Sequence, residues 1–175
     1  MEIKLPVVLS VDDNDVDGAL LQRAFKRTAI PAKLFTVNEG PQALSYLSGV
    51  GIYQNREQYP IPDLILLDIR MPKMSGLEVL NWIRLQPDLK QATVLILSSS
   101  EQPEDITSAK RIGADGYLVK PTKFEDLQKL VRGLESDWLG KKTKAQARPR
   151  AKASPITQPV SAPAILPQPP ELVPG

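Results

Sequence analysis

Acidic residues that end apolar strands are the residues of this sequence best suited to chemistry. Asp68 directly follows the run 63–67, whose leucines and isoleucine predict a short strand. Asp12 and Asp13 directly follow a second apolar run, 7–11. Ligands of open α/β sheets bind just beyond the carboxyl ends of the strands, so we expect these three carboxylates to form one site.

A lysine and a serine follow two later apolar runs in the same way. Lys120 ends the run 117–119, and Ser98 follows the run 94–97. At the same edge of a sheet, Lys120 would supply a positive charge and Ser98 a hydroxyl donor. Pro121 makes the preceding peptide bond able to adopt the cis form, which would aim Lys120 into the site.

The chemistry that this set allows is phosphoryl transfer assisted by a divalent cation. Asp13 and Asp68, with Asp12 behind them, would repel one another unless a cation neutralised them. Mg²⁺ prefers carboxylate, carbonyl and water oxygens, so the acidic cluster predicts a magnesium site. An ionised aspartate beside Mg²⁺ can attack phosphorus and form an acyl phosphate, whose charge Lys120 and Ser98 could stabilise.

The composition excludes several other kinds of site. The chain has no histidine and no cysteine, which excludes imidazole and thiolate metal ligands and every Ser-His or Cys-His nucleophile. No apolar run approaches the roughly 18 residues of a membrane span, and the first residues do not form a signal peptide. We therefore expect a cytoplasmic protein with no membrane partner.

Strand and helix signals alternate along the chain, and this alternation predicts the fold. The expected strands cover 7–11, 32–37, 63–67, 94–97 and 116–119. The expected helices cover 15–27, 41–47, 77–85, 103–112 and 122–138. Alternating strands pair in parallel through right-handed crossovers, and continuous apolar strands are buried on both faces. The sequence therefore predicts an α/β fold, a doubly wound three-layer sandwich with a five-stranded parallel sheet.

Two local patterns add detail to the expected helices. In the first helix, Val16, Leu20 and Ala24 follow the helical repeat with Leu21 and Phe25 beside them, which predicts an amphipathic helix. In the last helix, Thr122 and Glu125 have the spacing of a capping box, which predicts that the helix begins at Thr122.

Composition divides the chain near residue 140. Residues 1–139 carry a net charge of −3 and residues 140–175 a net charge of +5, so the basic balance does not indicate that the folded part binds nucleic acid. Residues 140–175 also hold eight of the 17 prolines and no aromatic residue. Such a segment buries too little apolar surface to offset its ordering entropy. We expect one domain, 1–139, and a disordered, basic, proline- and alanine-rich tail, 140–175.

Together, these motifs resemble the receiver domain of two-component response regulators, including its chemotaxis members. The matching segments are Val11-Asp12-Asp13, Asp68 with Met71-Pro72-Lys73-Met74-Ser75-Gly76, Ser98, and Tyr117-Leu118-Val119-Lys120-Pro121. The intervals from Asp68 to Ser98 and from Ser98 to Lys120 also fit the family. The resemblance implies the flavodoxin-like strand order 2-1-3-4-5.

The resemblance also implies a role for each acidic residue. Asp68 would accept a phosphoryl group from a phosphohistidine. Asp13 and Asp68 would bind Mg²⁺ directly, with the backbone carbonyl of Arg70 as a third protein ligand. Asp12 would act mostly through water.

The remaining site residues would form the switch. Lys120 would neutralise the phosphoryl group, Ser98 would move to bond it, and Tyr117 would follow inward. This movement would reshape the face made by the fourth helix, the fifth strand and the fifth helix, through which the protein could also form a homodimer.

The implied function is a phosphoacceptor response regulator that signals through protein contacts, with no DNA-binding output domain. Its partners would be a histidine kinase or phosphotransfer protein and an unknown downstream protein. The long connection 49–62 is either a surface loop or a docking surface. With Tyr53, Arg56 and the segment 59–62, it resembles the small stand-alone response regulators that partner phytochrome-type and hybrid kinases.

Two alternative functions remain open on the sequence. The first is a receiver-like scaffold that works without phosphorylation. The second is an aspartyl-phosphate phosphohydrolase, although such enzymes usually carry a second aspartate where this chain has Arg70. We expect no enzyme activity beyond the protein's own phosphorylation and dephosphorylation.

Overall fold

The computed structural model of the protein describes residues 5–139. The expected disordered tail, 140–175, lies outside the described residues. No helix within 5–139 is long and apolar enough to cross a membrane.

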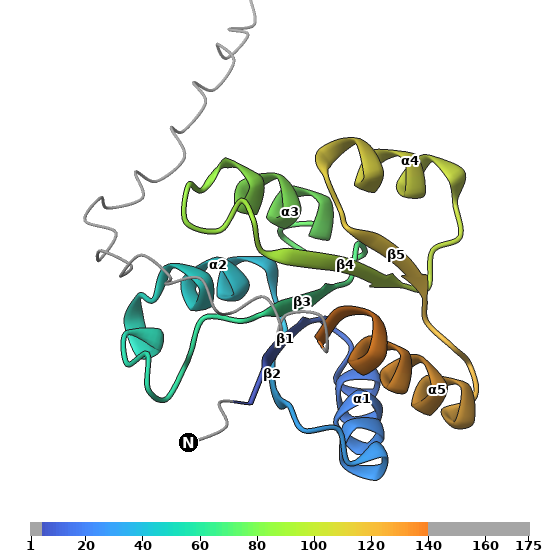
Figure 1. The fold of residues 1–175 in the computed structure, drawn as a ribbon. Coiled ribbons are helices and arrows are strands. Elements are labelled where there is room, and N and C mark those ends of the chain that lie inside the picture. Colours follow the sequence, from blue (N-terminus) through green and yellow to red (C-terminus); the bar gives the residue numbers. More distant parts are fainter. Residues whose placement is uncertain (1–4, 140–175) are drawn as a thin grey trace, which may run out of the picture.

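A five-stranded parallel sheet forms the centre of the domain. Its strands are β1 (Val7–Val11), β2 (Lys33–Val37), β3 (Leu64–Leu67), β4 (Thr93–Ser98) and β5 (Gly116–Val119). They lie in the order β2-β1-β3-β4-β5, and every neighbouring pair is parallel (Figure 1). The flavodoxin-like order implied by the family resemblance is therefore confirmed.

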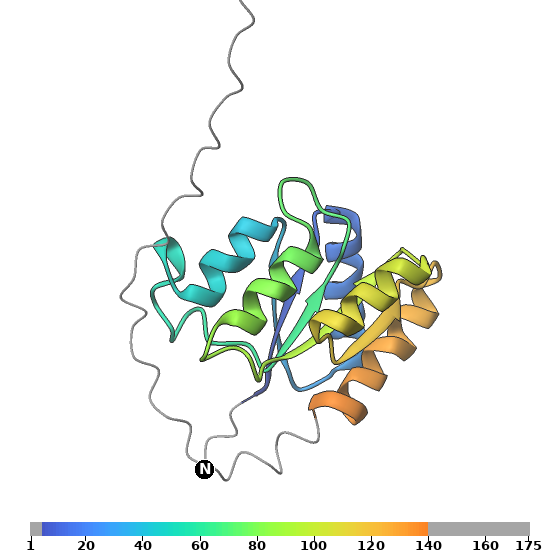
Figure 2. The ribbon, with the colours of Figure 1, turned by 90° about the horizontal axis from the view of Figure 1, so that it is seen from above.

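Helices cover both faces of the sheet. They are α1 (Asp15–Thr28), α2 (Gly40–Ser48), α3 (Gly76–Leu85), α4 (Pro103–Ile112) and α5 (Phe124–Leu134). Helices α1 and α5 pack together on one face, and α2, α3 and α4 lie side by side on the other (Figures 1 and 2). The predicted three-layer sandwich is confirmed.

Each face of the sheet has its own hydrophobic core, because successive side chains of a strand point to opposite faces. In β1, Leu9 and Val11 pack with the residues of α2 and α3, whereas Val8 packs with those of α1 and α5. The strands β1 and β3 are buried along their whole length. This double burial explains why both sequences are apolar except for Ser10 of β1, which is buried as well.

The helices that flank the site begin at polar caps. The Asn14 side chain accepts hydrogen bonds from the backbone N–H groups of Val16 and Asp17, at 3.0 and 3.2 Å. Ser75 and Glu78 form a capping box that begins α3 just after the loop that follows β3. These caps fix where α1 and α3 begin, and with them the loops that carry the acidic residues.

One sequence prediction about the helices was wrong, and another holds only in part. The capping box expected at Thr122 does not form; α5 begins at Phe124, with Lys123 as a cap that makes no side-chain bond. In α1, Val16 and Leu20 are exposed, and the buried residues are Leu21, Ala24 and Phe25. Of the five residues in the expected repeat, the three that pack in the core with the sheet and α5 are thus the buried ones.

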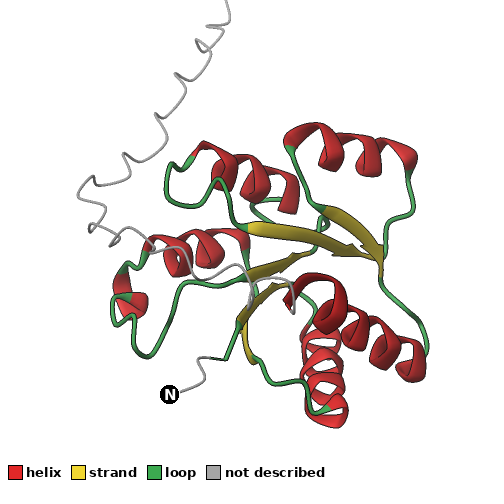
Figure 3. Cartoon of the chain, in the orientation of Figure 1, coloured by secondary structure: helices red, strands yellow, loops and turns green. Residues whose placement is uncertain are grey.

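The long connection between α2 and β3 packs against the domain and contains a short 3₁₀ helix, η1 (Gly51–Tyr53) (Figure 3). Its Arg56 side chain donates to the carbonyl oxygens of Tyr46 and Leu47, both at 2.8 Å, and so caps the end of α2. The Tyr53 ring packs tilted, and the Tyr59 ring edge-on, against the Tyr46 ring, with ring centroids 5.1 and 6.1 Å away. The connection is thus an ordered surface loop, and a docking role for it stays a prediction.

Candidate functional site

The three predicted carboxylates meet at the carboxyl ends of β1 and β3. Val11 pairs with Leu67 across these strands, so the residues that follow them lie next to each other. The backbone N–H of Asp68 donates to the Val11 carbonyl at 2.9 Å. One carboxylate oxygen from each of Asp12, Asp13 and Asp68 lies within 4.8 Å of the other two.

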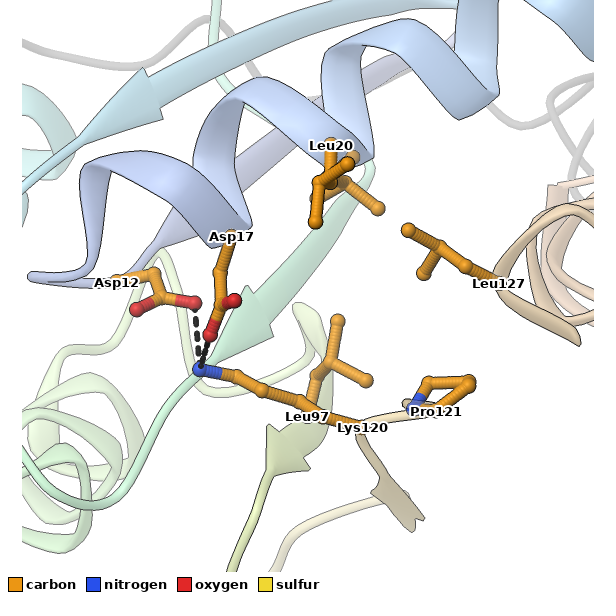
Figure 4. A pocket seen from close by; sticks show the side chains of 8 residues that line it. Asp12, Asp17, Leu20, Leu97, Lys120, Pro121 and Leu127 are labelled. Atoms are coloured by element: carbon orange, nitrogen blue, oxygen red, sulfur yellow. Dashed lines mark hydrogen bonds and ion pairs between the residues drawn. The ribbon is translucent and has the colours of Figure 1, made fainter. Parts of the chain in front are cut away.

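Lys120 reaches this cluster from the end of β5. Its ammonium nitrogen Nζ lies 2.7 Å from Asp12 Oδ2, 2.9 Å from Asp68 Oδ2 and 2.9 Å from Asp17 Oδ2. Figure 4 shows Lys120 extended toward Asp12 and Asp17 at the end of an apolar pocket whose wall includes Pro121. The peptide bond before Pro121 is trans, like every other among residues 5–139, so the cis geometry expected at this bond was wrong.

Ser98 completes the contacts of the Asp68 side chain. The Ser98 hydroxyl donates to Asp68 Oδ1 at 2.7 Å, and both residues are buried. The backbone N–H of Arg70 also approaches Asp68 Oδ1, at 3.4 Å. Asp68 therefore has one oxygen facing hydrogen-bond donors of Ser98 and Arg70, and the other facing the Lys120 ammonium.

Burial and charge set the protonation of the site. Burial raises the pKa of Asp12, and hydrogen bonds from Lys120 and the Asn14 N–H offset only part of this effect. Burial alone would lower the pKa of Lys120, but its hydrogen bonds to Asp12, Asp68 and Asp17 outweigh burial and raise that pKa. Lys120 thus stays charged at neutral pH, because the carboxylates that it contacts favour its ammonium form.

The donor set of the cluster fits a hard divalent cation. All ligand atoms that Asp12, Asp13 and Asp68 offer are oxygens, the type that Mg²⁺, Ca²⁺ and Mn²⁺ prefer. Asp13 is exposed, so a cation with several water ligands could reach it. The cluster could therefore hold a metal ion.

The other predicted residues lie around the loop between β4 and α4. The Tyr117 hydroxyl donates to the Ser100 carbonyl oxygen at 2.8 Å, and burial raises the pKa of Tyr117. The Arg70 guanidinium points to α4, where it donates to Asp105 Oδ2 at 2.9 Å. The predicted role of the Arg70 carbonyl as a metal ligand stays a prediction.

Two acidic residues near the site were not predicted from the sequence. Asp17 and Asp105 each lie three residues after the cap of a helix, α1 and α4 respectively. Acids at this position are common because they favour the helix N-terminus, so the pattern gave no sign of a second role. The signal that could have placed Asp17 near the site is the Asn14 cap. It begins α1 directly after Asp12 and Asp13, so the first turn of α1, which holds Asp17, lies close to the strand ends.

The site residues and the strand order together are those of a known family. The chain matches the response regulator receiver domain over residues 8–132. The chain belongs to this family. The match includes Asp12, Asp68, Ser98 and Lys120, and the recognition made from the sequence motifs is confirmed.

Relatives of this receiver domain come from bacteria and plants. Response regulator Rcp1 of Synechocystis sp. is 38% identical over 133 residues, which cover 76% of this chain and 88% of Rcp1. Two-component response regulator ARR17 of Arabidopsis thaliana is 36% identical over 126 residues, which cover 70% of this chain and 80% of ARR17.

Solved structures of response regulators superpose on this chain. The phosphorylated cyanobacterial phytochrome response regulator RcpA has a TM-score of 0.72 and 35% identity, covering 79% of this chain and 96% of RcpA. RPA3017, from red light signaling of R. palustris, has a TM-score of 0.73 and 36% identity, covering 77% and 94%. The Mn²⁺-bound form of Rcp1 has a TM-score of 0.68 and 37% identity, also covering 77% and 94%.

This family membership fixes the general function of the chain. It is a receiver domain of two-component signal transduction. Receiver domains interact with histidine kinases or with phosphotransfer proteins, so the chain belongs to a pathway of that kind.

Proposed function

We propose that this receiver domain accepts a phosphoryl group on Asp68 from a phosphohistidine of its partner. The observation that carries the proposal is the set of contacts around the Asp68 carboxylate. The Ser98 hydroxyl lies 2.7 Å from Oδ1 and the Lys120 ammonium lies 2.9 Å from Oδ2. These donors hold the carboxylate at the strand end and can also bind the oxygens of a phosphoryl group attached to it.

The transfer exchanges one bond to phosphorus for another. An oxygen of the ionised Asp68 carboxylate attacks phosphorus and forms the P–O bond of an acyl phosphate. The P–N bond of the phosphohistidine breaks, and its electron pair returns to the imidazole nitrogen of the donor. Lys120 neutralises charge on the phosphoryl oxygens, and Ser98 can turn its hydroxyl from Oδ1 to one of them.

We propose Mg²⁺ as the cation of the acidic cluster. Asp13 and Asp68 would bind it directly, Asp12 through water, and the Arg70 carbonyl would be the third protein ligand. Mg²⁺ held by these residues would neutralise negative charge on the phosphoryl oxygens. The Mn²⁺-bound form of the relative Rcp1 supports a divalent cation of this class.

The protein would act as a switch and not as an enzyme for other substrates. An aspartyl-phosphate phosphohydrolase needs a general acid near its nucleophile, usually an aspartate two residues later. Here that residue is Arg70, whose guanidinium binds Asp105. We propose that the chain catalyses only its own phosphorylation and dephosphorylation.

The partner that we propose is a histidine kinase of the phytochrome type. Two similar structures, RcpA and RPA3017, are described as response regulators of phytochrome or red light signaling. The output would pass through the α4–β5–α5 face, near Tyr117, to a downstream protein or to a second copy of the chain. Nucleic acid and membrane are not part of this proposal.

Intact mass after incubation with acetyl phosphate tests the proposal. With Mg²⁺ the wild-type protein should gain one phosphoryl group, and excess EDTA should prevent the gain. Asp68→Asn keeps the size and loses the nucleophilic charge, so it should gain none. A gain in Asp68→Asn equal to that of the wild type would show that another residue is the acceptor.

A further inference from the structure

A closed ring of hydrogen bonds joins the acceptor aspartate to helix α4. The Ser98 hydroxyl donates to Asp68 Oδ1 at 2.7 Å and accepts from the Ser100 N–H at 3.4 Å. The Ser100 hydroxyl donates to Asp105 Oδ2 at 2.5 Å, and the Arg70 guanidinium donates to the same oxygen at 2.9 Å. The Arg70 backbone N–H closes the ring at Asp68 Oδ1, at 3.4 Å.

The bond between Arg70 and Asp105 is the part of this ring that can be broken at least cost. The Arg70 side chain is 64% exposed, and that of Asp105 is 18% exposed. The Ser100 hydroxyl, and after it Arg70, lowers the pKa of Asp105, so Asp105 is ionised at neutral pH. An ion pair with so exposed a partner contributes little to stability, because water and salt screen it.

A phosphoryl group on Asp68 would compete with Asp105 for the Arg70 guanidinium. The phosphoryl group adds roughly −1.5 to −2 charges and three acceptor oxygens. Guanidinium binds such oxygens through two parallel hydrogen bonds, whereas Asp105 offers it one oxygen that Ser100 already occupies. The Arg70 backbone already contacts Asp68, so the guanidinium can reach this group by rotation of its own side chain.

We propose that Asp105 is a positioning residue that holds Arg70 away from the acceptor, and that phosphorylation of Asp68 draws Arg70 from Asp105 to the phosphoryl group. This proposal rests on the proposed function. Arg70 then acts as a second phosphoryl-binding cation beside Lys120. The transfer leaves Asp105 with Ser100 as its remaining hydrogen-bond partner in the ring.

The transfer would also connect phosphorylation to the surface at Tyr117. The Tyr117 hydroxyl donates to the Ser100 carbonyl at 2.8 Å, so Tyr117 is held by the same loop as the ring. When Ser98 turns to the phosphoryl group and Arg70 leaves Asp105, the loop loses two of its connections to the site. The ring therefore couples the charge at Asp68 to the position of the β4–α4 loop and of Tyr117.

Binding of beryllofluoride, a mimic of the acyl phosphate, tests the proposal. The protein is titrated with beryllofluoride at saturating Mg²⁺, and amide NMR shifts give the dissociation constant. Asp105→Asn keeps the size of the side chain but frees Arg70, so binding should tighten by about two- to fivefold, the value of an exposed ion pair. Arg70→Ala should weaken binding by about three- to tenfold, because it removes one largely solvent-exposed hydrogen bond to the mimic. Arg70→Lys should recover part of this loss.

The double variant separates competition from simple structural support. If Asp105 acts by holding Arg70, Asp105→Asn should have no effect in the Arg70→Ala background. Glu104→Gln is the matched control: it removes the same charge from the same turn of α4 and should leave the dissociation constant unchanged.

Three results would overturn the proposal. Weaker binding in Asp105→Asn would mean that Asp105 only supports the loop. Equal tightening in Glu104→Gln, or in the Arg70→Ala background, would mean that the effect is general electrostatics. Failure of the wild-type protein to bind beryllofluoride at all would instead contradict the proposed function.

Discussion

Gly76 lies against the backbone of Asp68, and a Cβ atom at Gly76 would be 1.9 Å from the Asp68 carbonyl oxygen. The first residue of α3 thus packs directly on the acceptor residue. We predict that Gly76→Ala displaces Asp68, lowers the free energy of unfolding by about 1–3 kcal/mol, as overpacked sites do, and slows phosphorylation. Urea denaturation and the rate of phosphorylation by acetyl phosphate measure the two effects.

Gly133→Ala is the control for this prediction. Nothing lies within 4 Å of a Cβ atom at Gly133, and the residue is in helix α5. Alanine there should leave the phosphorylation rate unchanged. It should raise the free energy of unfolding by no more than about 1 kcal/mol. Equal effects of the two substitutions would refute the role given to the contact at Gly76.

Lys120 is predicted to stabilise the fold as well as the phosphoryl group. Its ammonium contacts three carboxylates and its side chain is only 14% exposed. Lys120→Met keeps the apolar stem, leaves the carboxylates without their cation, and should lower the free energy of unfolding by about 1–3 kcal/mol at pH 7. Lys129→Met, which breaks the exposed pair with Asp126, should have no measurable effect on stability. A Lys120 variant as stable as the wild type would contradict this account.

Asp13 is predicted to be a direct ligand of Mg²⁺. Asp13→Asn removes one of few protein carboxylates, so the dissociation constant of Mg²⁺ should rise by a factor of about 10 or more, equivalent to about 1.4 kcal/mol. Isothermal titration with MgCl₂ measures it. Asp15→Asn is the control, because Asp15 binds the Asn38 side chain and lies outside the acidic cluster. Equal affinity in Asp13→Asn and the wild type would rule out the ligand role.

Tyr46 should make stability sensitive to alkaline pH. Burial raises the pKa of Tyr46 from 10.0 to about 12, an effect that Arg56 partly offsets. Because the folded protein favours the neutral phenol, the stability due to this group is fully present below pH 10 and is lost as the pH rises through about 12. The difference in tyrosinate absorbance between the wild type and Tyr46→Phe should have its midpoint near pH 12. A midpoint near pH 10, the ordinary value, would show that Tyr46 is not buried in solution.

The strand ends and their residues could be predicted because they depend on short-range patterns. Largely apolar runs of four or five residues locate β1, β3 and β4, and Asp12, Asp68 and Ser98 follow from where those runs end. Parallel pairing then brings these ends together without knowledge of any side-chain contact. The order of the strands came from the resemblance to the family and not from the runs themselves.

The contacts that could not be predicted depend on how separate elements are placed. The bonds from Lys120 to Asp17 and from Arg70 to Asp105 join residues that are 103 and 35 positions apart in the sequence. Each bond depends on how a helix is rotated about its own axis against the sheet. The packing of the whole core determines that rotation. The pattern at Thr122 failed for a local reason: a capping box is a weak preference, and the packing of α5 sets where that helix begins.

Chemical mapping of the phosphorylated residue tests the central claim most directly. Borohydride reduces an aspartyl phosphate to homoserine, and peptide mass spectrometry locates that residue in the chain. After phosphorylation by acetyl phosphate with Mg²⁺, homoserine should occur at position 68 and at none of positions 12, 13, 17 and 105. Homoserine at one of those positions, or its absence from position 68 in protein that has gained a phosphoryl group, would contradict the account.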